Sequence, residues 1–230
     1  MNRTVLLFGD GIGIGQWDAQ GGWAARISRD LMATAMQHGT RQSDTLYNLS
    51  VDGDTSHDVV QRMHAESLAR AREGGVNVTL VHIGLQNAFH LTRGSSRVEM
   101  CQMYEAHLKQ MAGICAQVRS RLMFIGLIGA DEERFDPGGR AFVGEEYRDA
   151  DLAALNRTLV EFCFEQRHPL VQVRDEFFKA GLDHVLSDGV RPNTQGHQLL
   201  HDLVREPLTQ LLAGGNPSIP TERPTPQPAP

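Results

Sequence analysis

The sequence predicts an α/β protein, a three-layer αβα sandwich around a central parallel sheet. Short apolar runs alternate with helical apolar patterns along most of the chain, which is the order typical of parallel sheets with helical crossovers. The run at 122–128 is apolar almost throughout, as expected of a strand covered on both faces. Polar, glycine-containing segments follow the runs, where the carboxyl ends of parallel strands build a site.

Length and composition favour one folded domain followed by a tail. The chain has 230 residues, 40% of them hydrophobic and 22% charged, which suits a single core and not a disordered polyampholyte. We expect the domain to span residues 1–213. Six of the 10 prolines lie between 217 and 230, so residues 214–230 are predicted to form a disordered, proline-rich tail.

The charge balance and the apolar runs argue against two classes of partner. Acidic side chains outnumber basic ones by 28 to 22, and no two Lys or Arg residues are adjacent, whereas a sequence-independent grip on nucleic acid needs many cations. No run approaches the roughly 18 apolar residues of a membrane span. The apolar start at 4–8 is too short for a signal-peptide core. We expect a cytoplasmic protein with no nucleic-acid or membrane partner.

Five apolar runs are the predicted strands. They are residues 5–8, 45–51, 76–83, 122–128 and 170–173. Between them, apolar side chains three and four residues apart predict helices, with stripes formed by Trp23, Ile27, Leu31 and Ala35, and by Leu152, Leu155, Leu159 and Phe162. A last helix is expected from about Gly196, and Pro207 within it predicts a kink.

Two helix starts carry a capping signal. Thr55 is followed three residues later by Asp58, and Ser96 by Glu99. In such a pair each side chain accepts a hydrogen bond from a backbone amide that the first helical turn leaves unpaired. We therefore expect helices to begin directly after Thr55 and Ser96.

The three cysteines, Cys101, Cys115 and Cys163, form no Cys-x-x-Cys pair. Cys101 and Cys115 fall on the apolar stripe of one predicted helix, together with Val98 and Tyr104. Free cysteine packs as a small apolar side chain, and no His stands at ligand spacing. The sequence predicts buried thiols, no metal site and no cofactor.

Four short segments follow the predicted strands in a recognisable order. They read Leu-Phe-Gly-Asp at 7–10, Asn-Leu-x-x-x-Gly-Asp-Thr-Ser at 48–56, Ile-Gly-x-x-Asn at 83–87, and Ser-Asp-Gly-x-x-Pro-Asn-x-x-Gly-His at 187–197. In order and spacing this set resembles the four blocks of the SGNH, or GDSL-type, esterase and lipase family. The resemblance implies the flavodoxin-like fold of SGNH hydrolases and covers the chain from Thr4 to about Leu212.

The resemblance also implies a chemistry, ester hydrolysis through an acyl-enzyme. In the family a Ser of the first block attacks the ester, and a His of the last block, oriented by an Asp three residues before it, takes the proton. The amide of that Ser, a Gly amide of the second block and an Asn side chain of the third hold the oxyanion.

This chain departs from the family pattern at three of those five positions. Gly11 stands where the family has Ser, Gln86 where it has Asn, and Arg191 where it has His, while Gly53 and Asp188 match. Gly11 offers no nucleophile, and an arginine stays protonated near pH 7, so it is no base. The extra methylene of Gln86 moves its amide by roughly 1.5 Å. The neighbouring Asn87 is an alternative donor through a shifted register. The sequence therefore predicts a pseudoenzyme without efficient turnover.

We expect the remaining groups to bind rather than to react. The amides of Gly11 and Gly53 persist, and backbone amides beside an arginine suit carboxylate, phosphate or sulfate. The predicted binding residues, for a small anionic or acyl ligand, are Asp10, Gly11, Gly53, Gln86, Asn87, Asp188 and Arg191. A protein partner or a homo-oligomer is a further expectation. Two alternatives stay open: an Arg191–Asp188 ion pair that closes the pocket, and a slow or rewired esterase acting on small acyl or carbohydrate esters.

Other residues near the expected loops are weaker candidates for a catalytic or binding role. His57, His82 and His184 lie near the expected loops but are interpreted as structural. Asp10 and Asp188 are weak candidates for activating water, because an exposed carboxylate is a poor base at pH 7. The glycines of the first loop do not fit the dinucleotide-binding spacing.

Overall fold

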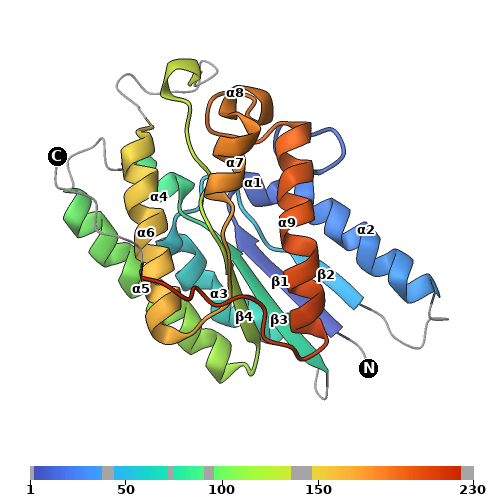
Figure 1. Cartoon of the computed structure of the whole chain (residues 1–230). Helices are drawn as coiled ribbons and strands as arrows, with labels where there is room; N and C mark the ends of the chain where they lie inside the picture. Colours follow the sequence, from blue (N-terminus) through green and yellow to red (C-terminus); the bar gives the residue numbers. More distant parts are fainter. Residues whose placement is uncertain (1–2, 38–43, 72–74, 91–95, 136–146, 224–230) are drawn as a thin grey trace.

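The computed structural model describes residues 3–37, 44–71, 75–90, 96–135 and 147–223. Its five strands form one parallel sheet in the order β2-β1-β3-β4-β5 (Figure 1). They span Arg3–Gly9 (β1), Asp44–Asn48 (β2), Val76–His82 (β3), Arg121–Ile125 (β4) and Leu170–Val171 (β5). The predicted α/β fold with a parallel central sheet is confirmed, and the strand order is the flavodoxin-like one.

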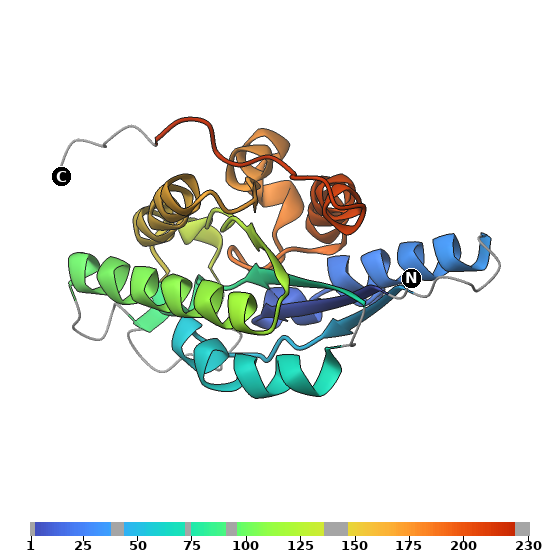
Figure 2. The ribbon, with the colours of Figure 1, turned by 90° about the horizontal axis from the view of Figure 1, so that it is seen from below.

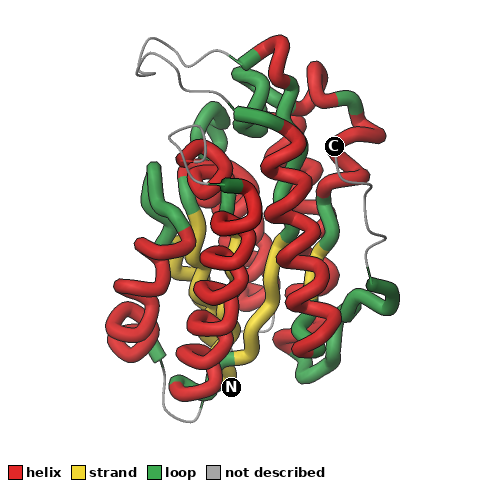
Figure 3. The backbone as a smooth tube through the Cα atoms, turned by 90° about the vertical axis from the view of Figure 1, so that its left-hand side faces the viewer, coloured by secondary structure: helices red, strands yellow, loops and turns green. Residues whose placement is uncertain are grey.

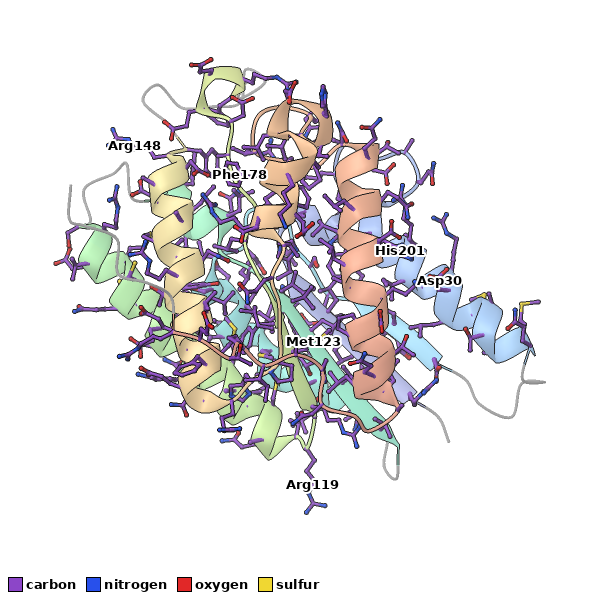
Figure 4. All side chains as sticks on the ribbon, in the orientation of Figure 1. Asp30, Arg119, Met123, Arg148, Phe178 and His201 are labelled. Atoms are coloured by element: carbon purple, nitrogen blue, oxygen red, sulfur yellow. The ribbon has the colours of Figure 1, made fainter. Side chains whose placement is uncertain are left out.

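Helices cover both faces of this sheet. Figure 2 shows α3 and α5 below the strands and α9 above them, and Figure 3 shows the strands enclosed by helices. The larger helices are α2 (Gly22–Gln37), α3 (Ser56–Arg70), α5 (Arg97–Gln117), α6 (Asp149–Gln166) and α9 (Thr194–Leu212). α2 packs against α9, α3 against α5, and α5 against α6. Between α2 and α9, His201 Nε2 lies 2.8 Å from Asp30 Oδ2 (Figure 4).

Both predicted capping boxes are present. Thr55 caps α3 and Ser96 caps α5, and in each the side chain of the N3 residue, Asp58 or Glu99, accepts from the cap amide. Pro207 does not end α9, which runs on to Leu212. None of the described helices is long and apolar enough to cross a bilayer.

The segment after β2 continues along β1 beyond the last strand residue. Leu49 N donates to Leu7 O at 2.8 Å, and Val51 N donates to Gly9 O at 3.0 Å. This pairing carries the chain to the carboxyl end of β1, so that the Asp52 side chain reaches Gly11.

The core holds two of the three thiols. Cys115 and Cys163 are buried, whereas Cys101 is only half-buried. Val98, predicted on the same buried stripe, is 65% exposed. The stripe is therefore correct from Tyr104 onward and wrong for the first turn of α5, which extends past the sheet.

Residues 214–223 differ from the free tail predicted for them. Leu170 N donates to Ser218 O at 3.1 Å, and Pro217 and Pro220 are buried. Arg223 pairs with Glu165 on α6. This part of the tail packs along β5 because its prolines cover the apolar edge of the sheet. Residues 224–230 lie outside the described residues.

Shorter elements surround the carboxyl ends of the strands. They are α1 (Gly11–Ile14), α4 (Leu85–His90), the 3-10 turn Glu132–Arg134, α7 (Arg174–Ala180) and α8 (Leu182–Val185). None was predicted, because each is too short to show helical periodicity. They form much of the surface around the predicted site.

Candidate functional site

Asp10 caps the short helix that follows β1. Its Oδ1 accepts from the amide of Ile12 at 2.9 Å, and the residue is 2% exposed. Burial raises the pKa of Asp10 to about 7, and the nearby Asp52 carboxylate adds to the rise, against the opposing effects of the Ile12 hydrogen bond and Arg191. Asp188 is buried as well. The premise that these carboxylates are exposed is therefore wrong.

The space above Gly11 is occupied by two side chains from its surroundings. A Cβ atom built on Gly11 would lie 2.3 Å from Gln16 Oε1 and 2.8 Å from Asp52 Oδ1. Gln16 is two residues beyond α1, and Asp52 comes from the segment after β2. The position that the resemblance assigns to a nucleophile thus has no side chain, and the movable ends of the Gln16 and Asp52 side chains cover it.

The backbone donors of the predicted oxyanion hole are present. Gly53 is exposed, with φ of +83°, a conformation that glycine adopts without strain. No atom lies within 4 Å of a Cβ placed there. Among the described residues, neither the Gly11 amide nor the Gly53 amide donates a hydrogen bond. Two backbone N–H groups therefore remain free beside the first and second loops.

The two amide side chains of α4 have different surroundings. Gln86 lies close enough to the Tyr147 hydroxyl to lower its pKa, against the larger effect of burial. Asn87 Oδ1 accepts from the Ser56 amide at 2.9 Å, and Asn87 Nδ2 donates to Ser56 Oγ at 2.8 Å. Asn87 therefore ties α4 to the start of α3 and is not the free donor that a shifted register would supply.

Tyr147 belongs to the site, although nothing in the sequence analysis pointed to it. It is 4% exposed, and its ring packs between Phe89 and Phe135 at centroid distances of 5.2 and 5.0 Å. Burial raises the pKa of this phenol above its ordinary value, and the charges of Arg191, Asp10 and Asp188 also act on it. A neutral hydroxyl thus stands among the predicted binding residues. It belongs to no motif, so only tertiary contacts reveal it.

Arg191 and Asp188 form the internal ion pair that one of the open alternatives described. Asp188 Oδ1 accepts from the amides of Val190 and Arg191, at 3.2 and 2.8 Å. Asp188 Oδ2 lies 2.5 Å from a terminal nitrogen of the Arg191 guanidinium. The Arg191 side chain remains 23% exposed. Asp188 thus neutralises the charge of Arg191.

The histidines near the loops divide into buried and exposed ones. His82 is buried, and burial with the neighbouring His197 lowers its pKa to about 4. His197, also buried, places Nε2 2.9 Å from Gln16 O. Ser56 Oγ lies 2.8 Å from His107 Nδ1, but Ser56 is fully buried and beyond the reach of a substrate. The His57 and His184 side chains lie at the surface.

A parallel sheet in this strand order, with loops gathered where the strands end, defines an α/β protein of the flavodoxin-like kind. The sequence profile of the GDSL-like lipase/acylhydrolase family matches residues 7–199. The chain belongs to this family, so the resemblance drawn from the four segments is confirmed.

Several solved structures share the fold at low identity. The lipase/acylhydrolase from Enterococcus faecalis superposes with a TM-score of 0.68 at 20% identity, covering 94% of this chain and 98% of that one. A lipolytic G-D-S-L protein from Veillonella parvula gives 0.66 at 15%, covering 90% and 99%. An acetyl xylan esterase from Geobacillus stearothermophilus gives 0.63 at 16%, covering 87% and 92%. No curated protein sequence matches significantly.

Proposed function

We propose that this chain is a non-hydrolytic member of the GDSL-like family, which binds an acyl ligand without cleaving it. One observation carries the proposal: the nucleophile position is Gly11, and Gln16 and Asp52 converge on the space that a serine side chain would need. No acyl-enzyme forms at a residue without a side chain.

The position of the general base supports the same conclusion. Arg191 carries a fixed positive charge, and the Asp188 carboxylate pairs with it. In a serine hydrolase, loss of one triad member leaves only roughly a thousand- to ten-thousandfold acceleration over water. Here both the nucleophile and the base are replaced, and neither replacement compensates for the other.

The charges favour a neutral acyl group over an anion. Asp10 lies near both Asp52 and Arg191, and Asp188 already neutralises the Arg191 guanidinium. An added carboxylate or phosphate would meet this acidic surrounding, whereas a carbonyl oxygen needs only donors. The amides of Gly11 and Gly53 are such donors, and the side-chain amide of Gln86 is a third. An amide or ester carbonyl is therefore the group that this arrangement suits best.

One observation favours the alternative of a slow, rewired esterase. A carboxyl whose pKa lies at about 7, as for Asp10, is matched to general-base work near neutral pH. In that mechanism Asp10 would deprotonate a water molecule that attacks the ester directly. Residual turnover that disappears in Asp10→Asn would identify this route.

The proposal is tested by restoring the family residues. We expect Gly11→Ser, Gln86→Asn and Arg191→His together to raise hydrolysis of short-chain aryl esters from background to clear turnover. The gain should be larger when Gln16→Ala also clears the space above residue 11. The matched control carries Gln86→Asn and Arg191→His but keeps Gly11, and should stay at background.

Two further measurements on the wild-type protein test whether it is, on the contrary, an active hydrolase. A fluorophosphonate should label no serine of the wild type and should label Ser at position 11 of the restored variant. Calorimetric titration should show saturable binding of acetamide in preference to acetate and phosphate. Covalent labelling of the wild type, or equal turnover in wild type and restored variant, would show that the chain is an active hydrolase.

A further inference from the structure

Trp17, which follows Gln16 directly in the chain, is exposed in an unusual backbone conformation. It is 60% exposed, although it is one of only two tryptophans. Its φ is +65°, in the left-handed region that a bulky L-residue rarely adopts. A large apolar side chain held in solvent by an unfavourable backbone conformation points to a contact made outside the chain.

The residues on either side of Trp17 fix this conformation. Gln16 N donates to Gly11 O at 3.1 Å, and Gln16 O lies 2.9 Å from Nε2 of the buried His197. Asp18 is buried, pairs with Arg26, and accepts from the amide of Gly22 at 3.1 Å. The loop is therefore anchored immediately before and after Trp17, so the exposure of its indole is imposed by the fold.

Two further exposed apolar side chains flank the same groups. Ile14, 40% exposed, is three residues after Gly11 in one helical turn, so both lie on the same side of α1. Val51, 46% exposed, directly precedes Asp52 and bonds through its amide to Gly9. We call Ile14, Trp17 and Val51 the apolar rim. Its members are the chain neighbours of the two side chains, Gln16 and Asp52, that cover Gly11.

We propose that the apolar rim is a subsite for a flat, apolar group, an aromatic or alicyclic ring, attached to the acyl carbonyl that the site binds. This inference rests on the proposed function and names its ligand class: a neutral amide or ester with a ring next to its carbonyl. Trp17 and Val51 adjoin in the chain the two residues, Gln16 and Asp52, that reach Gly11, and this adjacency links the rim to the carbonyl site. Indole faces stack well against such rings.

The test compares acyl amides that differ only in the attached group. Acetamide and benzamide are titrated against the wild type, Trp17→Ala and the matched control Trp17→Phe. We expect benzamide to bind the wild type at least about tenfold more tightly than acetamide, because a ring adds apolar area to the contact. In Trp17→Ala this preference should fall to about twofold or less, while Trp17→Phe, which keeps a flat ring, should retain most of it.

The tryptophan emission gives an independent readout. Trp23 is fully buried and Trp17 is exposed, so a blue shift on adding benzamide reports the covering of Trp17. The shift should be absent with acetamide and absent in Trp17→Phe. Circular dichroism confirms that each variant is folded, and the wild-type comparison stands even if a variant is not.

The outcomes separate this inference from the proposed function. Equal binding of acetamide and benzamide, without an emission shift, would leave the acyl site standing and refute the rim as a subsite. Binding of neither amide would refute both. Unchanged preference in Trp17→Ala would also overturn the role given to Trp17.

Discussion

At the scale of single residues, burial determines the protonation of the carboxyl groups in the site. Asp10 is held in a nearly water-free position by its role as helix cap. The protonated form of such a carboxyl is favoured in the folded protein, because ionisation there lacks solvation by water. Its pKa is raised from 3.8 to about 7. The stabilisation due to protonated Asp10 is therefore complete below pH 3.8 and is lost as the pH rises through 7.

Asp10→Asn tests this linkage. The amide oxygen of Asn still accepts from the Ile12 amide but carries no charge. We expect the variant to have a higher free energy of unfolding than the wild type at pH 8, an advantage that shrinks steadily towards pH 4. Urea denaturation at pH 4, 6 and 8 measures the difference. Asp52→Asn, at an exposed neighbour, is the control and should change the profile much less. If the free energies of unfolding of Asp10→Asn and of the wild type changed with pH in parallel, the raised pKa of Asp10 would be contradicted.

The motifs point to positions in the chain, but not to the contacts that those residues make in the fold. Gly11, Gln86 and Arg191 stand out because they break a family pattern at known positions. Gln16 above Gly11 and Tyr147 beside Gln86 do not, because each reaches the site through a contact between segments that no spacing rule encodes. The Arg191–Asp188 ion pair was one of two open alternatives, since residues three apart in a loop either pair or diverge according to the turn.

At the scale of elements, the turn from α1 to α2 depends on close backbone approach. Gly15 ends α1 with φ of +91°, and a Cβ there would lie 2.4 Å from the backbone carbon and oxygen of Gly21. No side chain can move to relieve such a contact. The long helices were predictable because caps and apolar stripes act locally. The four-residue turns α1 and α8 were not, because packing between loops stabilises them.

Gly15→Ala should therefore be strongly destabilising. We expect a loss of about 3 kcal/mol or more in the free energy of unfolding, from strain and backbone overlap together. Gly113 in α5 is the matched control, since it is exposed and a Cβ there meets nothing within 4 Å. Gly113→Ala should stabilise the protein by up to about 1 kcal/mol through helix propensity. Similar values for the two variants would refute the close-approach argument.

At the scale of the whole molecule, the C-terminal segment is part of the folded unit. Composition alone suggested a free tail from residue 214, because proline-rich sequence lacks periodicity whether it is free or packed. The structure lays Pro217 and Pro220 against the sheet edge at β5. Composition indicates that a proline-rich segment forms no helix or strand, but it does not indicate whether the segment packs against the domain.

Deleting residues 216–230 should lower the free energy of unfolding by about 1–3 kcal/mol, from the lost proline burial and the lost hydrogen bond to Leu170. Thermal or urea unfolding measures the change. Arg223→Ala removes only an exposed ion pair and should cost less than about 1 kcal/mol. A deletion without effect would restore the view of 214–223 as a free tail.

The covering of Gly11 also bears on how many changes would build an esterase from this sequence. On the proposed function, Gly11→Ser alone would meet Gln16 and Asp52 and would face a cation at residue 191, so we expect it to give no measurable rate. Arg191→His alone would have no hydroxyl to activate. Ester cleavage at this position is therefore expected to need at least two substitutions made together, each without benefit on its own.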